Sequence, residues 1–397
     1  MAQRSPQYAS FVPVDARRET CWRPTWPLRF GLVVALQWFL ASRLHAEDHV
    51  DYRFEYYKEG GERIQVDTQS LLFDLGLADG LTARGEMVYD SISGASPIGK
   101  PPLPGESDVQ LYEVVETRWA GVGGVDYTKG QNTLSPQISY STESDYVSTT
   151  LSLNDAISFN KKNTTLRLGV AHSFDEIEPS FFTGPQYKNT TDFLVGISQI
   201  LTTTTIFTAD FTYGNAAGYL SDPYKQILFT GFGDPNNIHP ENRPAHRERQ
   251  VLLVSLTQYV NPLEGSAELS YRFYHDSYDV FSHTVEVAWF QRIGEHLILA
   301  PVFRYYEQSA AYFYYISVPG FVPGDGDPNR PEYYSADYRL SHLQTFTFGA
   351  QATVLIADRL ALDIGYQRYE MYGLDDMTAA SNYPKANIAT IGFRLWF

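Results

Sequence analysis

The sequence contains very little sulfur: 1 Cys and 4 Met occur among 397 residues. The single cysteine, Cys21, has no apolar run before it, so it does not lie in a lipobox. The absence of cysteine after residue 47 excludes disulfides, zinc–thiolate sites and thiol nucleophiles from that part of the chain. Such a composition suits the oxidising environment of a cell envelope.

Long apolar runs and basic residues are also scarce. No segment after residue 47 reaches the roughly 18 apolar residues that a transmembrane helix needs. The 30 Lys and Arg are outnumbered by 46 Asp and Glu, which gives a net charge of -16 and argues against a nucleic-acid partner. The chain is instead rich in Tyr and Phe, with 29 and 24 copies, a composition that favours strands.

Residues 1–46 are predicted to be a signal peptide. A mostly apolar stretch at 30–41 follows several arginines, the order of a basic n-region and an h-region. This stretch is too short to cross a bilayer. Ala46 provides a small residue for cleavage, and Ala41 is the alternative. We therefore expect an exported protein whose folded part spans residues 47–397.

Apolar and polar residues alternate along most of the remaining chain. In one example, Phe346 and Phe348 fall on one face while Thr345 and Thr347 fall on the other. The alternating segments run to 10 residues or more, which is longer than most soluble strands and matches tilted membrane strands. The pattern predicts an all-β fold, a transmembrane antiparallel up-and-down β-barrel of about 16 strands. The predicted strands are 49–58, 62–78, 81–92, 111–126, 133–144, 147–159, 163–174, 190–201, 204–213, 247–260, 265–275, 281–292, 297–308, 341–356, 361–371 and 386–397.

The connections between these strands differ between the two ends of the barrel. Those after even-numbered strands are tight, as at Asp79-Gly80. The long connections follow only odd-numbered strands, at 93–110, 175–189, 214–246, 309–340 and 372–385. Short periplasmic turns and long extracellular loops are typical of outer-membrane barrels. Within segment 62–78 the apolar pattern changes phase near Ser70, which predicts a β-bulge there.

The C-terminal segment indicates how the barrel closes and is assembled. Ile391, Phe393, Leu395 and Phe397 share one face, and the chain ends on an aromatic residue. This ending resembles the signal read by the outer-membrane assembly machinery, so that machinery and outer-membrane lipid are expected partners. A free strand edge cannot be satisfied inside a bilayer, so the last strand is predicted to pair with the first. The predicted location is the bacterial outer membrane.

A set of charged residues lies on the polar face of the predicted strands. Because charges facing lipid are costly, we expect these side chains to face the lumen. The set is Arg53, Glu55, Arg84, Glu86, Arg118, Asp210, Glu268, Arg272, Glu286, Arg304, Asp363 and Arg394. They could line a pore for polar solutes or form ion pairs that brace the wall or a plugged lumen. The mixed signs argue against a strongly ion-selective pore.

No segment supplies a recognisable catalytic or metal site. The stretch from His239 to Glu248 fits no standard zinc spacing, and we predict a solvated outer loop there. A lipase would need a Ser–His pair with an orienting group, and none can be nominated. We therefore expect no enzyme activity, cofactor or metal. The Pro- and Gly-rich segment 318–330 and segment 214–246 are expected to fold into the lumen, to grip a partner or to remain surface loops.

The segment Asp90-Ser-Ile-Ser-Gly-Ala-Ser-Pro-Ile-Gly99 resembles the motif of a bacterial family known only as a domain of unknown function. Its members are predicted outer-membrane barrels. The resemblance covers nearly all of 52–397 and implies fold and location, but no activity or site residues. Further matching blocks are Ser144-Asp-Tyr146, Leu153-Asn-Asp-Ala156, Phe159-Asn160, Lys162-Asn-Thr-Thr165, Gly218-Tyr-Leu-Ser-Asp-Pro-Tyr-Lys225, Glu241-Asn-Arg-Pro244, Arg249-Gln250, Tyr271-Arg-Phe-Tyr274, Ser282-His-Thr284, Tyr305-Tyr306, Gln308-Ser309 and Ala336-Asp-Tyr-Arg-Leu-Ser341.

Four polar residues of these blocks are predicted to lie at the extracellular end: Asp90, Asp145, Asp222 and Asn242. They could cap turns or line a shared mouth, and we favour a role in turn and rim structure. The expected function is a porin-like channel for small polar solutes. The alternative is a barrel that acts as a scaffold or sheath for a periplasmic or lipoprotein partner. An outer-membrane lipid enzyme is a weaker alternative.

Overall fold

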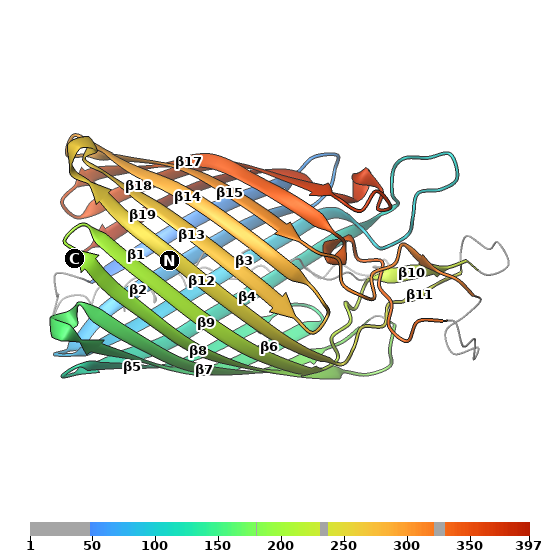
Figure 1. The fold of residues 1–397 in the computed structure, drawn as a ribbon, viewed down its shortest axis with the longest axis horizontal. Helices are drawn as coiled ribbons and strands as arrows, with labels where there is room; N and C mark the ends of the chain where they lie inside the picture. Colours follow the sequence, from blue (N-terminus) through green and yellow to red (C-terminus); the bar gives the residue numbers. More distant parts are fainter. Residues whose placement is uncertain (1–47, 180, 231–236, 321–329) are drawn as a thin grey trace, which may run out of the picture.

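The computed structural model describes residues 48–179, 181–230, 237–320 and 330–397; the predicted signal peptide, 1–46, lies outside these residues. Sixteen strands form one closed antiparallel barrel (Figure 1), so the predicted fold class and strand number are confirmed. The barrel strands are β1 (His49–Glu59), β2 (Gln65–Ala78), β3 (Leu81–Pro97), β4 (Leu111–Lys129), β5 (Asn132–Thr142), β6 (Tyr146–Phe159), β7 (Thr164–Ile177), β8 (Gln186–Thr202), β9 (Thr205–Gly218), β12 (His246–Val260), β13 (Gly265–Asp276), β14 (Phe281–Ile293), β15 (Leu297–Gln308), β17 (Leu343–Ala357), β18 (Leu360–Gly373) and β19 (Lys385–Trp396).

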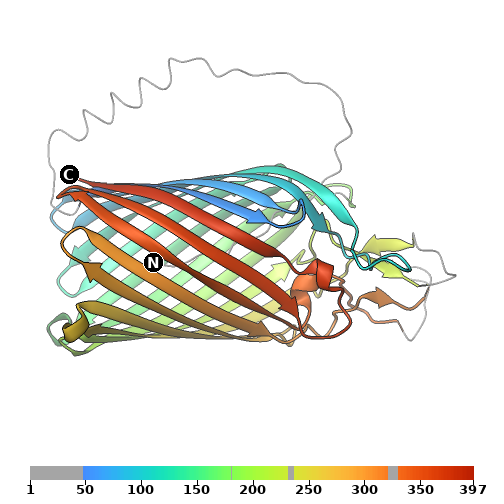
Figure 2. The same ribbon diagram turned by 90° about the horizontal axis from the view of Figure 1, so that it is seen from above.

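Three short strands form a second sheet outside the barrel wall. They are β10 (Gln226–Phe229), β11 (Ile238–Pro240) and β16 (Ser317–Val318), in the order β11-β10-β16. Figures 1 and 2 show this sheet beyond the strand ends on the side of the long loops, while the described chain ends lie at the opposite end. The 3-10 helices are η1 (Asn160–Lys162), η3 (Asn261–Leu263), η4 (Tyr338–Leu340) and η5 (Ala380–Asn382). Over the described ranges, no helix is long and apolar enough to cross a membrane.

The barrel closes through β1 and β19, as predicted. Their antiparallel register runs from His49↔Trp396 to Glu59↔Ala386 without a shift. Closure leaves no strand edge with unpaired N–H and C=O groups, which a bilayer requires. Large hydrophobic side chains are exposed on the outer face, including Met87 at 61% and Trp119 at 60%. Such a continuous apolar surface suits contact with lipid rather than water.

The predicted bulge at Ser70 is wrong. The pairing of β2 with β3 runs without interruption from Gln65 to Gly76, and its register shift lies between Gly76 and Ala78. The apolar pattern changes because the surroundings of the outer face change along β2. Leu71 is exposed in the apolar band, whereas Gln69, nearer the extracellular end, accepts a hydrogen bond from Tyr52 Oη at 3.2 Å.

Several strands extend beyond their predicted extracellular ends. β3 continues to Pro97 because its ladder with β4 persists as far as Leu111. The tight turns lie at the other end, and Gly80 shows why one of them needs glycine. Gly80 has φ +70°, and a Cβ atom there would lie 2.4 Å from the carbonyl oxygen of Thr128. The segregation of short turns from long loops therefore follows the predicted arrangement.

Candidate functional site: the extracellular mouth and the inner wall

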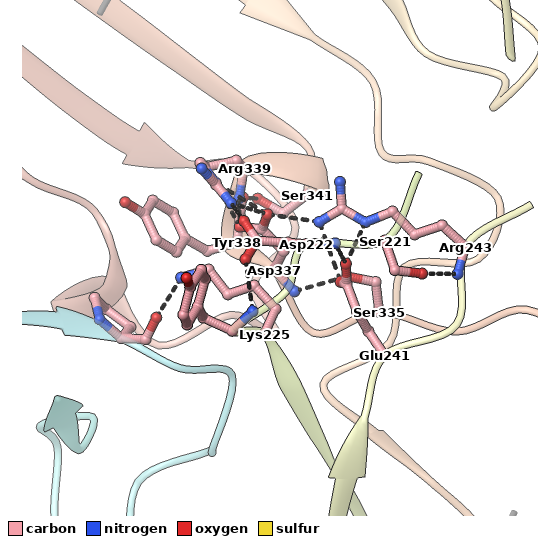
Figure 3. A network of polar contacts seen from close by, with 12 residues as sticks. Ser221, Asp222, Lys225, Glu241, Arg243, Ser335, Asp337, Tyr338, Arg339 and Ser341 are labelled. Atoms are coloured by element: carbon pink, nitrogen blue, oxygen red, sulfur yellow. Dashed lines mark hydrogen bonds and ion pairs between the residues drawn. The ribbon is translucent and has the colours of Figure 1, made fainter. Parts of the chain in front are cut away.

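Three extracellular loops meet at the mouth of the barrel, namely those that join β3 to β4, β9 to β12 and β15 to β17. The latter two supply the strands of the small sheet. A cluster of buried polar side chains connects these loops (Figure 3), and we call it the mouth network. Its members are Asp222, Lys225, Glu241, Arg243, Ser335, Asp337 and Arg339.

Asp337 is the centre of the mouth network. It caps η4 by accepting a hydrogen bond from the backbone N–H of Arg339 at 3.1 Å. Its carboxylate also accepts from Arg339 Nε at 2.9 Å and from Arg243 Nη2 at 2.9 Å. Burial alone raises the pKa of Asp337, but the charges of Arg339, Lys225 and Arg243 outweigh burial and hold the pKa well below its usual range. The carboxylate therefore stays ionised and paired.

Glu241 and Arg243 join the β9–β12 loop to the β15–β17 loop. Arg243 Nε lies 2.6 Å from Glu241 Oε1, and the side chain of Glu241 is fully buried. Ser335 Oγ donates a hydrogen bond to Glu241 Oε2. Burial raises the pKa of Glu241 to about 7, although the charge of Arg243 opposes the shift. Glu241 is thus the member of the network that titrates near neutral pH.

Lys225 ties the network to the end of β3. Its ammonium group donates to the carbonyl oxygen of Pro97 at 2.5 Å and lies 5.7 Å from the ring centroid of Tyr338. The backbone N–H of Gln226 donates to the carbonyl oxygen of Ile98 at 2.8 Å. Burial lowers the pKa of Lys225, while the charge of Asp337 opposes that change. All three loops are therefore joined through buried contacts.

Two of the four predicted mouth residues lie in or beside this network. Asp222 Oδ1 accepts a hydrogen bond from the backbone N–H of Tyr224 at 3.0 Å and thereby caps a turn. Asp222 Oδ2 accepts a hydrogen bond from Arg339 Nη2 at 2.6 Å. Asn242 forms an isolated antiparallel bridge with Tyr334, with backbone hydrogen bonds of 2.9 Å in both directions. Each residue therefore combines turn structure with contact between loops.

The stretch from His239 to Glu248 belongs to the outer loop and the start of β12, but only part of it is solvated, as at His246 and Glu248; the prediction is wrong for the rest. Glu241 is buried in the network, and only 11% of the Arg243 side chain is exposed. The ring of His239 packs edge-on against Phe229 with 5.2 Å between centroids. The segment is polar because its charges find partners in a distant loop, and the local sequence does not show those partners.

The other network members were not among the predicted site residues. Each nevertheless lies in or next to a block of the family resemblance. Lys225 ends one block, Glu241 and Arg243 share another, and Asp337 and Arg339 share a third. Pro97, the acceptor for Lys225, lies in the first block. The charged residues of these separate blocks were therefore the feature of the sequence from which the network members could have been identified.

Asp90 lies in the wall of the barrel, whereas Asp145 lies in the short connection at its rim. Asp90 is not in a turn as favoured above, because β3 continues past it to Pro97. It is buried and accepts from Thr68 Oγ1 and Arg118 Nε, both at 2.7 Å. Asp145 lies between β5 and β6, is 7% exposed, and has no hydrogen-bond partner for either carboxylate oxygen among the described atoms. Burial, followed by the charges of Glu116 and Glu143, raises the pKa of Asp145 to about 7.

The strand residues predicted to face the lumen lie opposite the exposed hydrophobic positions, and several form ion pairs across strands. Arg394 Nε lies 2.7 Å from Asp51, joining β19 to β1. Arg84 bridges two carboxylates, Asp74 at 3.0 Å and Asp126 at 2.8 Å. The structure also pairs Arg118 with Asp90 and Arg167 with Asp210, each at 2.6 Å. Arginine side chains therefore link neighbouring strands around the inner wall.

Other predicted lumen residues have different surroundings. Glu286 and Arg304 are direct cross-strand neighbours in the β14–β15 register, whereas Glu268 faces Ala288 across β13 and β14. The guanidinium of Arg272 lies 6.0 Å from the ring centroid of Tyr274.

The remaining predicted lumen residues have polar neighbours on the inner wall. Asp363 accepts a hydrogen bond from Thr353 Oγ1 at 2.5 Å. Arg53 and Glu55 follow one another on the same face of β1, and Glu86 lines a small hollow of about 110 Å³ with Arg118.

Glycines on the inner wall make room for two of the ion pairs. A Cβ atom on Gly196 would lie 1.9 Å from Asp210 Oδ1, the partner of Arg167. A Cβ atom on Gly214 would lie 2.3 Å from Asp192 Oδ1, the partner of Arg249. The close approach of the carboxylates to the backbone therefore depends on glycine at both positions.

The chemistry available at the mouth and wall is ion pairing and hydrogen bonding. Within the described ranges, no group of three or more His, Cys, Asp or Glu side chains is arranged to hold a metal ion. Most carboxylates of the mouth network are already satisfied by arginine, lysine or serine. The network is therefore suited to holding loops in place, and the wall is suited to presenting fixed charges of both signs.

Known structures share the fold. CdiB from Acinetobacter baumannii superimposes with a TM-score of 0.50 at 8% identity, covering 89% of this chain and 61% of that one. A bacterial polysaccharide outer membrane secretin gives a TM-score of 0.47 at 8% identity, covering 89% of this chain and 100% of that one. The siderophore receptor PirA from Pseudomonas aeruginosa gives 0.44 at 8% identity and 88% coverage, and the chain spans 62% of its length. The likeness to CdiB shows a shared barrel fold.

Sequence comparison points to a single family. No curated protein matches the chain. The profile of one family matches residues 34–185 and 181–382, which together make up most of the sequence. That agreement fits the blocks identified above, four of which meet at the mouth network. The chain belongs to the family described as protein of unknown function, DUF3570.

Proposed function

We propose that the protein is a channel for small polar solutes in the bacterial outer membrane. The observation that carries the proposal is the solvent-accessible charge on the inner wall of a closed barrel of sixteen strands. Arg84, although paired with Asp74 and Asp126, keeps 53% of its side chain exposed. Side chains packed in a filled core would lose that exposure. An inner wall that is charged and wet is typical of barrels with an aqueous lumen.

The position of the loop sheet supports the same proposal. In both ribbon views, β10, β11 and β16 stand beyond the ends of the barrel strands (Figures 1 and 2). The mouth network holds the loops at the extracellular end by buried contacts with the end of β3. A solute would therefore pass this cap before it reaches the wall charges. Such a cap limits solute size, while the mixed charges favour polar solutes of either sign.

Export and assembly complete the proposal. Residues 1–46 would direct export and be removed, and the terminal strand β19 would be recognised by the assembly machinery. In β19, Ile391 and Phe393 expose 48% and 47% of their surface on the outer face. Phe397 donates its backbone N–H to the carbonyl oxygen of Asp48 at 3.0 Å, at the start of β1. We propose no catalysed reaction for this barrel, which an assay for phospholipid hydrolysis would test.

Single-channel conductance of the purified full-length protein in a planar bilayer tests the channel. Stable ohmic steps support an aqueous pore, and the double variant Arg84→Gln/Asp126→Asn should change their size while it keeps the net charge. Silence from a protein whose folding is shown by heat-modifiable migration on gels would reject the channel. That result would favour the alternative, a scaffold or sheath for a periplasmic or lipoprotein partner, and a pull-down would follow.

A further inference from the structure

Lysine and arginine are unevenly distributed on the outer face of the barrel. In the extracellular half of the described strands, the outward-facing positions that carry them are Lys58 on β1, Lys385 on β19 and Arg368 on β18. These three strands are consecutive in the barrel order. Outward positions near the same end of other strands carry acids instead: Asp67 on the neighbouring strand β2, Glu113 on β4, Glu176 on β7, Glu248 on β12 and Glu307 on β15.

The register places these cations in adjacent positions. Lys58 pairs with Asn387, and Asn387 pairs with Arg368, so one row crosses three strands. Asn387 Oδ1 accepts from Arg368 Nη1 at 3.0 Å and thereby orients the guanidinium. Lys385 lies two residues nearer the mouth, with its ammonium 4.8 Å from the ring centroid of Tyr372. Two carboxylates lie close by: Glu370 faces Lys385 in the register and contacts Arg368 Nε at 3.2 Å, and Asp67 of β2 faces Tyr56. Three cations against two carboxylates leave an excess of one positive charge.

Toward the periplasmic end, the next outward residues of β1, β19 and β18 are first residues typical of the membrane interface and then apolar residues. The next row is Tyr56, Ala389 and Tyr366, and the following row is Phe54, Ile391 and Ile364. Tyrosine is enriched where lipid headgroups meet the hydrocarbon region, and aliphatic residues face the hydrocarbon itself. Ala389 lies between the two tyrosines and has only a methyl side chain, so it projects less from the wall than they do. The order from cation to tyrosine to apolar row matches that of a phosphorylated lipid, from headgroup to acyl chain.

We propose that the outer face of β1, β19 and β18 is a binding site for a phosphorylated lipid of the outer leaflet. Arg368 and Lys58 hold the phosphate, with Lys385 above them, and an acyl chain lies over Ala389 between Tyr56 and Tyr366. Arginine suits this role because its guanidinium can donate two hydrogen bonds to one phosphate. The lysines extend from an apolar wall toward the headgroup layer. The acidic rim elsewhere repels the same lipid, so binding concentrates at the seam where the barrel closes.

Native mass spectrometry of the full-length protein, released from micelles with equal amounts of phosphatidic acid and phosphatidylcholine, tests this site. We expect the protein to retain phosphatidic acid with a preference of roughly tenfold. The variant Arg368→Gln should lower that preference about fivefold, the effect of one cation near a lipid headgroup. The matched control is Lys129→Gln, which removes an outward cation at the periplasmic end of β4 and should leave the preference unchanged.

A second variant separates lipid from free phosphate. Ala389→Leu adds bulk between the two tyrosines without altering charge, and it should reduce retention of phosphatidic acid. Soluble glycerol phosphate in excess should compete weakly, because it lacks an acyl chain. Equal effects of Arg368→Gln and Lys129→Gln, or no preference for phosphatidic acid, would overturn the site. Full competition by glycerol phosphate would overturn its assignment to lipid.

Discussion

Arg243 in the β9–β12 loop donates a hydrogen bond to Asp337 in the β15–β17 loop at 2.9 Å, and both side chains are largely buried. The two residues are 94 positions apart in the chain. Asp337 also forms an ion pair with Arg339, and Arg243 also forms one with Glu241. This chain of alternating charges joins loops that the barrel wall does not hold, so the shape of the mouth depends on it.

Removing the central carboxylate should release the cap while the barrel stays folded. Asp337→Asn leaves Arg243 and Arg339 with a weaker partner, and breaking a buried ion pair costs about 3–5 kcal/mol. We expect faster proteolysis of the two long loops and larger conductance steps. Glu332→Gln is the matched control, because Glu332 is exposed on the same loop and touches the network only through its backbone. Identical proteolysis of the two variants would show that the network does not hold the loops.

The stability of the cap should fall as pH rises from about 4.5 to about 7. The pKa of Glu241 is raised to about 7 by burial, so the folded state holds its proton more tightly than the unfolded loop does. The stabilisation that protonated Glu241 gives the cap is therefore complete below the pKa of Glu241 in the unfolded loop. It is lost as the pH rises through the pKa of Glu241 in the folded state. The slope is at most about 1.4 kcal/mol per pH unit for one proton.

Hydrogen exchange of the bridging amides of Asn242 and Tyr334 measures this effect directly. Exchange rates corrected for intrinsic chemistry should show opening becoming easier toward neutral pH, and Glu241→Gln should flatten the curve. Asp145 also has a pKa raised to about 7 by burial and contributes in the same direction elsewhere on the rim. Asp337, whose pKa is held low, affects only far more acidic solutions. An unchanged curve in Glu241→Gln would assign the effect to another group.

Gly214→Ala should destabilise the barrel. The new Cβ atom would lie 2.3 Å from Asp192 Oδ1 and 3.0 Å from Arg249 Nη2, so the ion pair must move. Overpacking of this kind costs about 1–3 kcal/mol. Gly123→Ala is the control, since a Cβ atom at Gly123 meets nothing within 4 Å. Urea unfolding in micelles, followed by tryptophan fluorescence, should show a lower midpoint for Gly214→Ala alone.

Arg84→Gln should shift the channel toward cation selectivity. The change leaves Asp74 and Asp126 without the arginine that bridges them, so the exposed wall becomes more acidic. The reversal potential under a potassium chloride gradient should move in the direction of cation preference. The double variant Arg84→Gln/Asp126→Asn restores the net charge and should bring the potential back. A reversal potential unaffected by Arg84→Gln would place Arg84 outside the conduction path.

Deletion of Phe397 should lower the amount of assembled protein in the outer membrane. Phe397 follows the last residue of β19, and its backbone N–H donates to the carbonyl oxygen of Asp48, the residue before β1. Loss of the terminal aromatic should slow recognition by the assembly machinery while the purified chain still refolds in micelles. Quantifying the folded band in outer-membrane fractions tests this. Equal loss of refolding in vitro would indicate a structural role in barrel closure.

The barrel could be predicted from the local pattern of the sequence. Strand residues alternate between lipid and water with a period of two, so strand number, inner and outer faces and closure could be predicted from local pattern. The pattern led to the wrong prediction of a bulge at Ser70. Outward residues nearer the extracellular end than the apolar band are polar because they contact water, as lumen residues do. The arrangement of turns and loops was also readable, since tight turns require particular residues such as Gly80.

The arrangement of the mouth depends on contacts between loops that are distant in sequence. The loop sequences show no regular alternation, and the roles of their charged residues depend on partners far away in the chain. Glu241 accepts a hydrogen bond from Ser335, and Lys225 donates one to Pro97. The small sheet is also formed by distant segments, since Leu228 of β10 pairs in parallel with Ser317 of β16. A buried charge and a solvated charge look alike in sequence, because burial is a property of what packs against a residue. The outer cation row likewise arises because closure brings Lys58, near one end of the barrel sequence, beside Asn387 near the other.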